Sequence, residues 1–220
     1  MKEEELQDEL ASIRNMMERS SKFISLSGLS GILAGIYALI GAAFAYHVIY
    51  GQQYQLSAPL PPDLTATPRL EKFIYGSVFD SEARELLFIA LAVLVVSITT
   101  GVVLSIRKAK LKGQLVWGKT SKALLFHMAV PLVTGGLLIL ILIHRGHYSI
   151  AAPMSLIFYG LALIGAGNFT FSDVKYLGLS EIVLGLIAAC MPGYGLIFWS
   201  VGFGILHIIY GSVMYLKYDR

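Results

Sequence analysis

The chain alternates between long apolar runs and short polar connections. About 20 apolar residues are enough to cross a hydrocarbon core of about 30 Å. Six runs approach or exceed that length: residues 24–50, 85–106, 122–143, 150–171, 175–191 and 195–216. The pattern predicts an all-α fold, a polytopic membrane bundle of six transmembrane helices. The fifth run contains Glu181 and ends abruptly at Pro192, so a tilted short helix or a hairpin that does not fully cross remains an alternative.

The connections predict one membrane domain with small appendages. In residues 1–23, apolar side chains recur at steps of three and four, which predicts a cytoplasmic amphipathic helix lying against the membrane; a short coiled coil is the alternative. Residues 51–84 form the only long connection, predicted to be an external loop whose later part could lie as an interfacial helix. Residues 217–220 form a short cytoplasmic tail.

Composition and charge place the chain in a membrane and orient it. Hydrophobic residues make up 56% of the chain and charged residues 14%, which leaves too few polar groups to cover a soluble domain. With the amino terminus inside, thirteen of the seventeen Lys and Arg residues fall on one side. The external side keeps only Arg69, Lys72, Arg84 and Arg145. The positive-inside rule therefore predicts that both termini are cytoplasmic. The small net charge of +3 gives no indication of nucleic-acid binding.

Small residues follow one face of the first run. They recur at steps of three and four, as Ser27, Gly31, Ala34, Ala38, Gly41 and Ala45. Helices in lipid associate through close contact of such faces, so this helix is predicted to pack along its length against another helix. Lining of a substrate path is the alternative. We expect the lipid bilayer as one partner, and a homo-oligomer or a membrane protein as another.

Ionisable and amide groups within the runs are candidates for a ligand-binding or ion-binding site. Such groups usually face the bundle interior or a cavity, because hydrocarbon cannot solvate them. His127, Asn168 and Glu181 fall in the inner half of the membrane and His207 near its middle. Pro131 lacks the N–H that would bond the carbonyl of His127, which predicts a kink there. The sequence favours a cytoplasm-facing polar cavity, with structural hydrogen bonds between helices as the alternative.

Two histidine arrangements suggest a metal or haem. His47, His144 and His147 lie near the predicted external boundary, so they are weak candidates for a metal site, with Glu82 as a further ligand. His127 and His207 lie at similar depth and could hold a haem between them. The chain has no Cys-x-x-Cys-His attachment motif, and we expect no cofactor.

Motifs for enzymatic chemistry are not found. The chain contains no Gly-x-Ser-x-Gly elbow, no His-Glu-x-x-His and no phosphate-binding loop. Cys190 is the single cysteine, so no internal disulfide can form. The sequence therefore does not predict an enzyme.

Two segments resemble a family of small bacterial multi-pass membrane proteins of unknown function. These are the run from Arg19 to Gly35 and the end from Pro192 through Trp199 to Gly211, which includes His207. The resemblance implies six helices and the bacterial inner (plasma) membrane, without a substrate. We expect a protein that binds or transports a small molecule or ion. A non-catalytic structural or signalling accessory protein and a haem-binding redox protein are the alternatives.

Overall fold

A computed structural model describes residues 27–51, 68–111, 113 and 116–219, together with Gln7 and Ile13. On the helix that begins at Pro68, side chains are described from residue 81. Every regular element in these ranges is a helix. The predicted amphipathic helix over residues 1–23 lies outside the described residues except for Gln7 and Ile13, and so do residues 52–67 of the predicted external loop and Arg220 of the tail.

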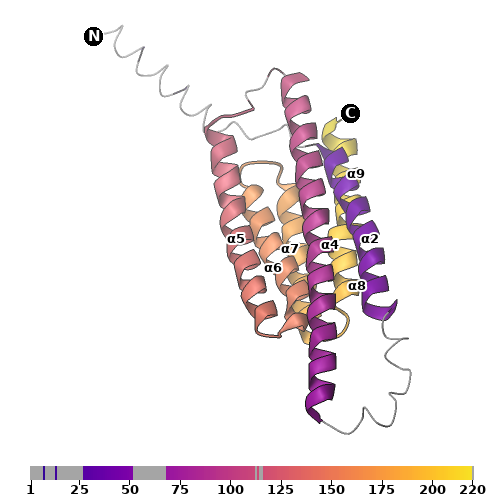
Figure 1. Ribbon diagram of the computed structural model, residues 1–220. Helices are drawn as coiled ribbons and strands as arrows, with labels where there is room; N and C mark the ends of the chain where they lie inside the picture. Colours follow the sequence, from indigo (N-terminus) through magenta and orange to yellow (C-terminus); the bar gives the residue numbers. More distant parts are fainter. Residues whose placement is uncertain are drawn as a thin grey trace.

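The helices run back and forth along one axis (Figure 1). They are α2 (Gly28–Gly51), α4 (Pro68–Leu111), α5 (Lys119–His144), α6 (Ala151–Ala166) after a 3₁₀ turn η1 (Tyr148–Ile150), α7 (Asp173–Cys190), α8 (Gly195–Trp199) and α9 (His207–Met214). Two π-helical segments, η2 (Ser200–Leu206) and η3 (Tyr215–Asp219), join α8, α9 and the carboxyl end into one continuous rod. We call this rod the C-terminal helix.

Five helices in the described residues are long and apolar enough to cross a membrane. They cover Gly28–Gly51, Ser81–Leu111, Lys119–His144, Tyr148–Ala166 and Gly195–Tyr218. The prediction of an all-helical fold is confirmed for the described residues, with five helices of membrane-spanning length. Helix α7, which corresponds to the predicted fifth span, is not among the five; it is shorter and carries Asp173, Lys175 and Glu181.

Helix α6 packs between α5 and α7, while α2 packs between α4 and the C-terminal helix. The C-terminal helix also contacts α6 and α7, so it joins the two halves of the bundle. In Figure 1, α5 and α2 lie on opposite sides of the molecule, and the C terminus lies at the end where α2 begins. The polar groups of α6, α7 and the C-terminal helix can therefore meet inside the bundle.

Glycines bring the backbones of α6 and α7 together. A Cβ atom added to Gly160 would lie 2.5 Å from the carbonyl oxygen of Gly178, and one added to Gly178 would lie 2.6 Å from that of Gly160. Further along, a Cβ on Gly185 would lie 2.9 Å from the Pro153 carbonyl oxygen. The two helices can approach this closely only because side chains are missing at the crossing.

The small residues of α2 pack on two different neighbours. Toward its start, α2 lies on the C-terminal helix, where a Cβ on Gly35 would be 2.6 Å from the Gly204 carbonyl oxygen. Toward its end, Gly41 faces Val93 of α4. Of the predicted small-residue face, Ala38, Gly41 and Ala45 are buried, and Ser27, Gly31 and Ala34 are half-buried.

Helix α4 extends well beyond its apolar part. It begins at Pro68, whereas the predicted span begins at residue 85. Proline is favoured in the first turn of a helix because its missing N–H has no partner there. The charged residues that mark the predicted loop do not prevent a helix; they only end its apolar stretch. In Figure 1 this end of α4 projects past the other helices.

Helix α5 continues through Pro131 from Lys119 to His144 as one helix. The His127 carbonyl, which loses its intrahelical partner because of Pro131, faces α6. A Cβ on Gly165 would lie 3.2 Å from that oxygen. The freed carbonyl therefore lies close against Gly165 of α6.

Candidate functional site

Glu181 lies on the face of α7 that packs into the bundle. This face consists of Gly178, Glu181, Gly185 and Ala188, all buried at steps of three and four along the helix. Because its neighbours on the face are small, α6 comes close to α7, and Gly202 of the C-terminal helix lies against the carboxylate. The Glu181 residue is 0% exposed.

His207 approaches the same place from the C-terminal helix. Its Nδ1 lies 3.0 Å from the Gly202 carbonyl oxygen, five residues earlier in the π-helical turn η2. Its Nε2 lies 2.7 Å from the hydroxyl of Tyr159 on α6. A carbonyl can only accept a hydrogen bond, so Nδ1 carries the hydrogen and Nε2 of the neutral ring accepts from the tyrosine hydroxyl.

The Glu181 carboxylate is beside this imidazole but has no hydrogen bond of its own. Its Oε1 lies 3.4 Å from His207 Nδ1, whose hydrogen is directed to Gly202. Neither carboxylate oxygen has a hydrogen-bond partner within the described part of the chain. A carboxylate in such surroundings is costly, because burial removes its water without full replacement.

The absence of a side chain at Gly202 makes room for the carboxylate. A Cβ there would collide with Oε2 of Glu181 and would lie 2.5 Å from Cδ2 of Leu156. One glycine in the π-helical turn thus serves two purposes. Its carbonyl accepts from His207, and its Cα allows Glu181 to fit. We call Tyr159, Glu181, Gly202 and His207 the buried polar site.

Aromatic rings enclose one side of this site. The ring of Phe203 lies 5.0 Å from that of Tyr159 and 5.1 Å from that of Trp199, measured between centroids. Such a cover lowers the local dielectric and strengthens interactions among the polar groups.

The four predicted ligand-binding residues do not form one cluster. Glu181 and His207 meet, but His127 is exposed on α5, where its ring stacks on Phe169 at 4.9 Å, and Asn168 is exposed just beyond α6. Tyr159 was not predicted. Its signal is a tyrosine in the middle of an apolar run, since a tyrosine within a bundle usually needs a partner for its O–H.

The histidines proposed for metal or haem binding are dispersed. His47, His144 and His147 are all exposed, and α2 and α5, which carry the first two, lie on opposite sides of the bundle (Figure 1). No group of three or more His, Cys, Asp or Glu side chains suited to a metal ion occurs in the described ranges. Both ring nitrogens of His207 are hydrogen bonded, which does not favour axial ligation of a haem shared with His127.

A second polar group lies where α7 begins and the chain ends. The Asp173 carboxylate accepts hydrogen bonds from Lys217 Nζ at 2.9 Å and from the Tyr218 hydroxyl at 2.8 Å. These bonds, the lysine's first, hold the pKa of the Asp173 carboxyl below its ordinary value. The Tyr218 ring stacks on Phe171 at 3.9 Å. This group, which we call the terminal latch, fastens η3 to the start of α7.

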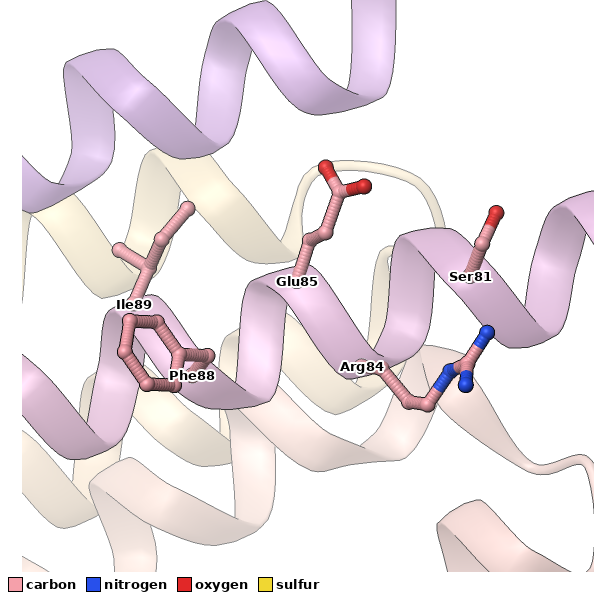
Figure 2. Close-up of a pocket in the computed structure, with 5 residues that line it drawn as sticks. All are labelled: Ser81, Arg84, Glu85, Phe88 and Ile89. Atoms are coloured by element: carbon pink, nitrogen blue, oxygen red, sulfur yellow. The ribbon is translucent and has the colours of Figure 1, made fainter.

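A shallow depression lies at the opposite end, on α4. It is lined by Ser81, Arg84, Glu85, Phe88 and Ile89, all from this one helix. In Figure 2, Glu85 and Arg84 point to opposite sides of α4. The polar groups do not converge, so the depression is a poor candidate for a binding site.

No family model, curated protein or solved structure matches the chain. The geometry of its own residues carries the functional argument.

Proposed function

We propose that the chain is a six-span protein of the bacterial inner membrane with both termini in the cytoplasm. Helix α7 supports the sixth crossing, because its 18 residues, at about 1.5 Å each, give a length close to that of the hydrocarbon core. The clustering of Lys and Arg at the end where α2 begins supports the orientation. The resemblance to small bacterial membrane proteins supports the compartment.

Within this frame, the protein binds a small molecule or ion at the buried polar site and carries it across the membrane. One observation carries the proposal: a fully buried Glu181 carboxylate with no hydrogen bond to either oxygen, beside a hydrogen-bonded imidazole. Ionisable groups at membrane depth are costly and generally functional. The site is smaller than the cavity predicted from the sequence, because His127 and Asn168 do not reach it.

Transport by purified protein in sealed vesicles tests this proposal. Wild type and a double variant, Glu181→Gln with His207→Gln, are reconstituted under an imposed membrane potential, and H⁺, Na⁺ and K⁺ fluxes are recorded. Native mass spectrometry of the same preparations detects a retained small molecule. We expect the wild type to show a flux of one of these ions or one retained small molecule, and we expect the double variant to lose it. Fluxes equal to those of empty vesicles, with no retained mass, would contradict the proposal.

Glu85→Gln is the matched control. It removes an exposed carboxylate of α4, away from the buried polar site. The flux or retained mass should be unchanged in this variant.

A non-catalytic accessory role is the second candidate. It is favoured by α4, whose most apolar stretch is not buried at all within the described structure. To test this role, residues 1–20 are removed and the oligomeric state is measured in detergent. The accessory role predicts that the oligomeric state changes.

A further inference from the structure

We infer that the species bound at the buried polar site is the proton. Glu181 accepts it, and Tyr159 and His207 deliver it. The inference rests on the proposed function of this site and names its substrate.

The surroundings of Glu181 suit a proton better than a metal ion. Calcium takes six to eight oxygen ligands and zinc about four ligands. At Glu181, Oε2 lies against Gly202, which the Leu156 side chain also approaches, and Oε1 lies 3.4 Å from His207 Nδ1. A proton needs one oxygen atom and no coordination shell.

One hydrogen bond, from Tyr159 to His207, and one short approach, from His207 to Glu181, form a path that ends at the carboxylate. A proton arriving at the Tyr159 hydroxyl oxygen allows that oxygen to give its own hydrogen to His207 Nε2. The imidazole then releases the hydrogen on Nδ1 to Glu181 Oε1, 3.4 Å away. One proton enters at Tyr159 and one resides on Glu181, while the imidazole stays neutral and changes tautomer.

The path has few competing groups. Of the elements packed against α7, α6 contributes Tyr159 and α9 contributes His207 and Tyr210, while α8 and η2 contain no titratable residue. The segment η3 contributes titratable side chains only at the start of α7, where Lys217 and Tyr218 bond Asp173. Tyr210 packs instead on the apolar cluster that includes Phe171, Leu177 and Met214. The Asp173 carboxylate of the terminal latch, the nearest acid before Glu181 on α7, is engaged by Lys217 and Tyr218.

Transfer to Glu181 also changes the backbone contact of the imidazole. Once Nδ1 has given up its hydrogen, it can no longer donate to the Gly202 carbonyl. That carbonyl belongs to η2, so proton arrival releases one hydrogen bond that involves the π-helical turn. Short π-helical segments are frequent at functional sites, and this one is linked directly to the proton on Glu181.

Infrared difference spectroscopy of the intact protein in vesicles tests the inference. Protein labelled with ¹³C-carboxyl glutamate is titrated from acid to alkaline pH, and the carbonyl stretch of protonated carboxylic acid is followed. We expect a band that titrates with pH, shifts with the label, is lost in Glu181→Gln and remains in Glu85→Gln. Tyr159→Phe should retain the band and slow its appearance after a pH jump at least several-fold.

Three results would overturn the inference: no titrating band assigned to Glu181, a band of unaltered kinetics in Tyr159→Phe, or displacement of the proton by added Na⁺ or Ca²⁺ at constant pH. Glu181→Asp, which keeps a carboxylic acid, serves as a second variant if Glu181→Gln does not fold.

Failure of the proton inference is distinct from failure of the proposed transport function. A Glu181-dependent Na⁺ flux without a titrating band removes the proton and leaves transport in place. A titrating band without any flux removes transport alone.

Discussion

A few side chains in the interior determine how His207 is held. The Gly202 carbonyl fixes the hydrogen on Nδ1, and this leaves Nε2 to accept from Tyr159. The ring is therefore held by bonds from two different helices. Removal of either hydrogen bond should make the imidazole ring more mobile without creating a cavity.

Tyr159→Phe isolates the first of these bonds. The substitution removes only the hydroxyl, and we expect the free energy of unfolding to fall by about 0.5–1.5 kcal/mol. Denaturant-induced unfolding in detergent micelles measures it. Tyr194→Phe, at an exposed position, is the control and should change the value by less than about 0.5 kcal/mol. Equal effects in both variants would contradict the assigned bond.

At the scale of the helices, close backbone contact is the main organising feature. Helix α6 meets α7 through Gly160 and Gly178, and α2 meets the C-terminal helix through Gly35 and Gly204. In each case a glycine faces a carbonyl of the other helix. These crossings set the depth at which Glu181 and His207 lie, so packing and site geometry are coupled.

Gly160→Ala tests the α6–α7 crossing. Its Cβ would lie 2.5 Å from the Gly178 carbonyl oxygen, which is backbone and cannot rotate away. We expect a loss of about 1–3 kcal/mol in unfolding free energy. Gly136→Ala in α5, where a Cβ meets nothing within 4 Å, should be neutral or stabilising by about 0.5–1 kcal/mol. If Gly136→Ala lowered the unfolding free energy more than Gly160→Ala, the α6–α7 crossing would not be closely packed.

The terminal latch should make stability depend on pH. The pKa of the Asp173 carboxyl is lowered in the folded protein, chiefly by its bond from Lys217. Its contribution is therefore fully present above the carboxyl's unfolded pKa and is lost as the pH falls through the lower, folded pKa. Asp173→Asn should melt earlier than wild type near neutral pH, and the difference should shrink on acidification. Thermal melts across acid pH measure this; a constant difference would contradict it.

At the scale of the molecule, the sequence predicts the helices better than the site. Apolar runs locate five membrane-length helices because lipid demands length and apolarity, which are local properties. The pattern also places Glu181 and His207 inside apolar runs, where such groups usually face the bundle interior. It cannot tell that His127 lies against Gly165 and Phe169 and does not join Glu181, because that depends on which side of α5 meets α6. It also cannot anticipate the π-helical turn, whose register depends on contacts between helices.

Cys190 allows the topology to be tested without added cysteines. It is exposed at the end of α7. In the proposed topology this residue faces the periplasm, so a membrane-impermeant maleimide should label it in intact cells whose outer membrane is permeabilised. A Cys190→Ser, Asp219→Cys variant should be labelled only after lysis. Labelling of both variants from outside would contradict six spans with internal termini.

The Glu181 carboxylate, buried without a hydrogen bond, affects how this protein should tolerate mutation. A buried carboxylate without hydrogen bonds is maintained at the expense of stability, so apolar replacement often stabilises, by about 1–4 kcal/mol for a whole buried ion pair. Selection for heat resistance alone, with no demand for activity, should therefore enrich substitutions such as Glu181→Met. The residue most readily discarded under that selection is the one to which we assign the proposed binding of a proton.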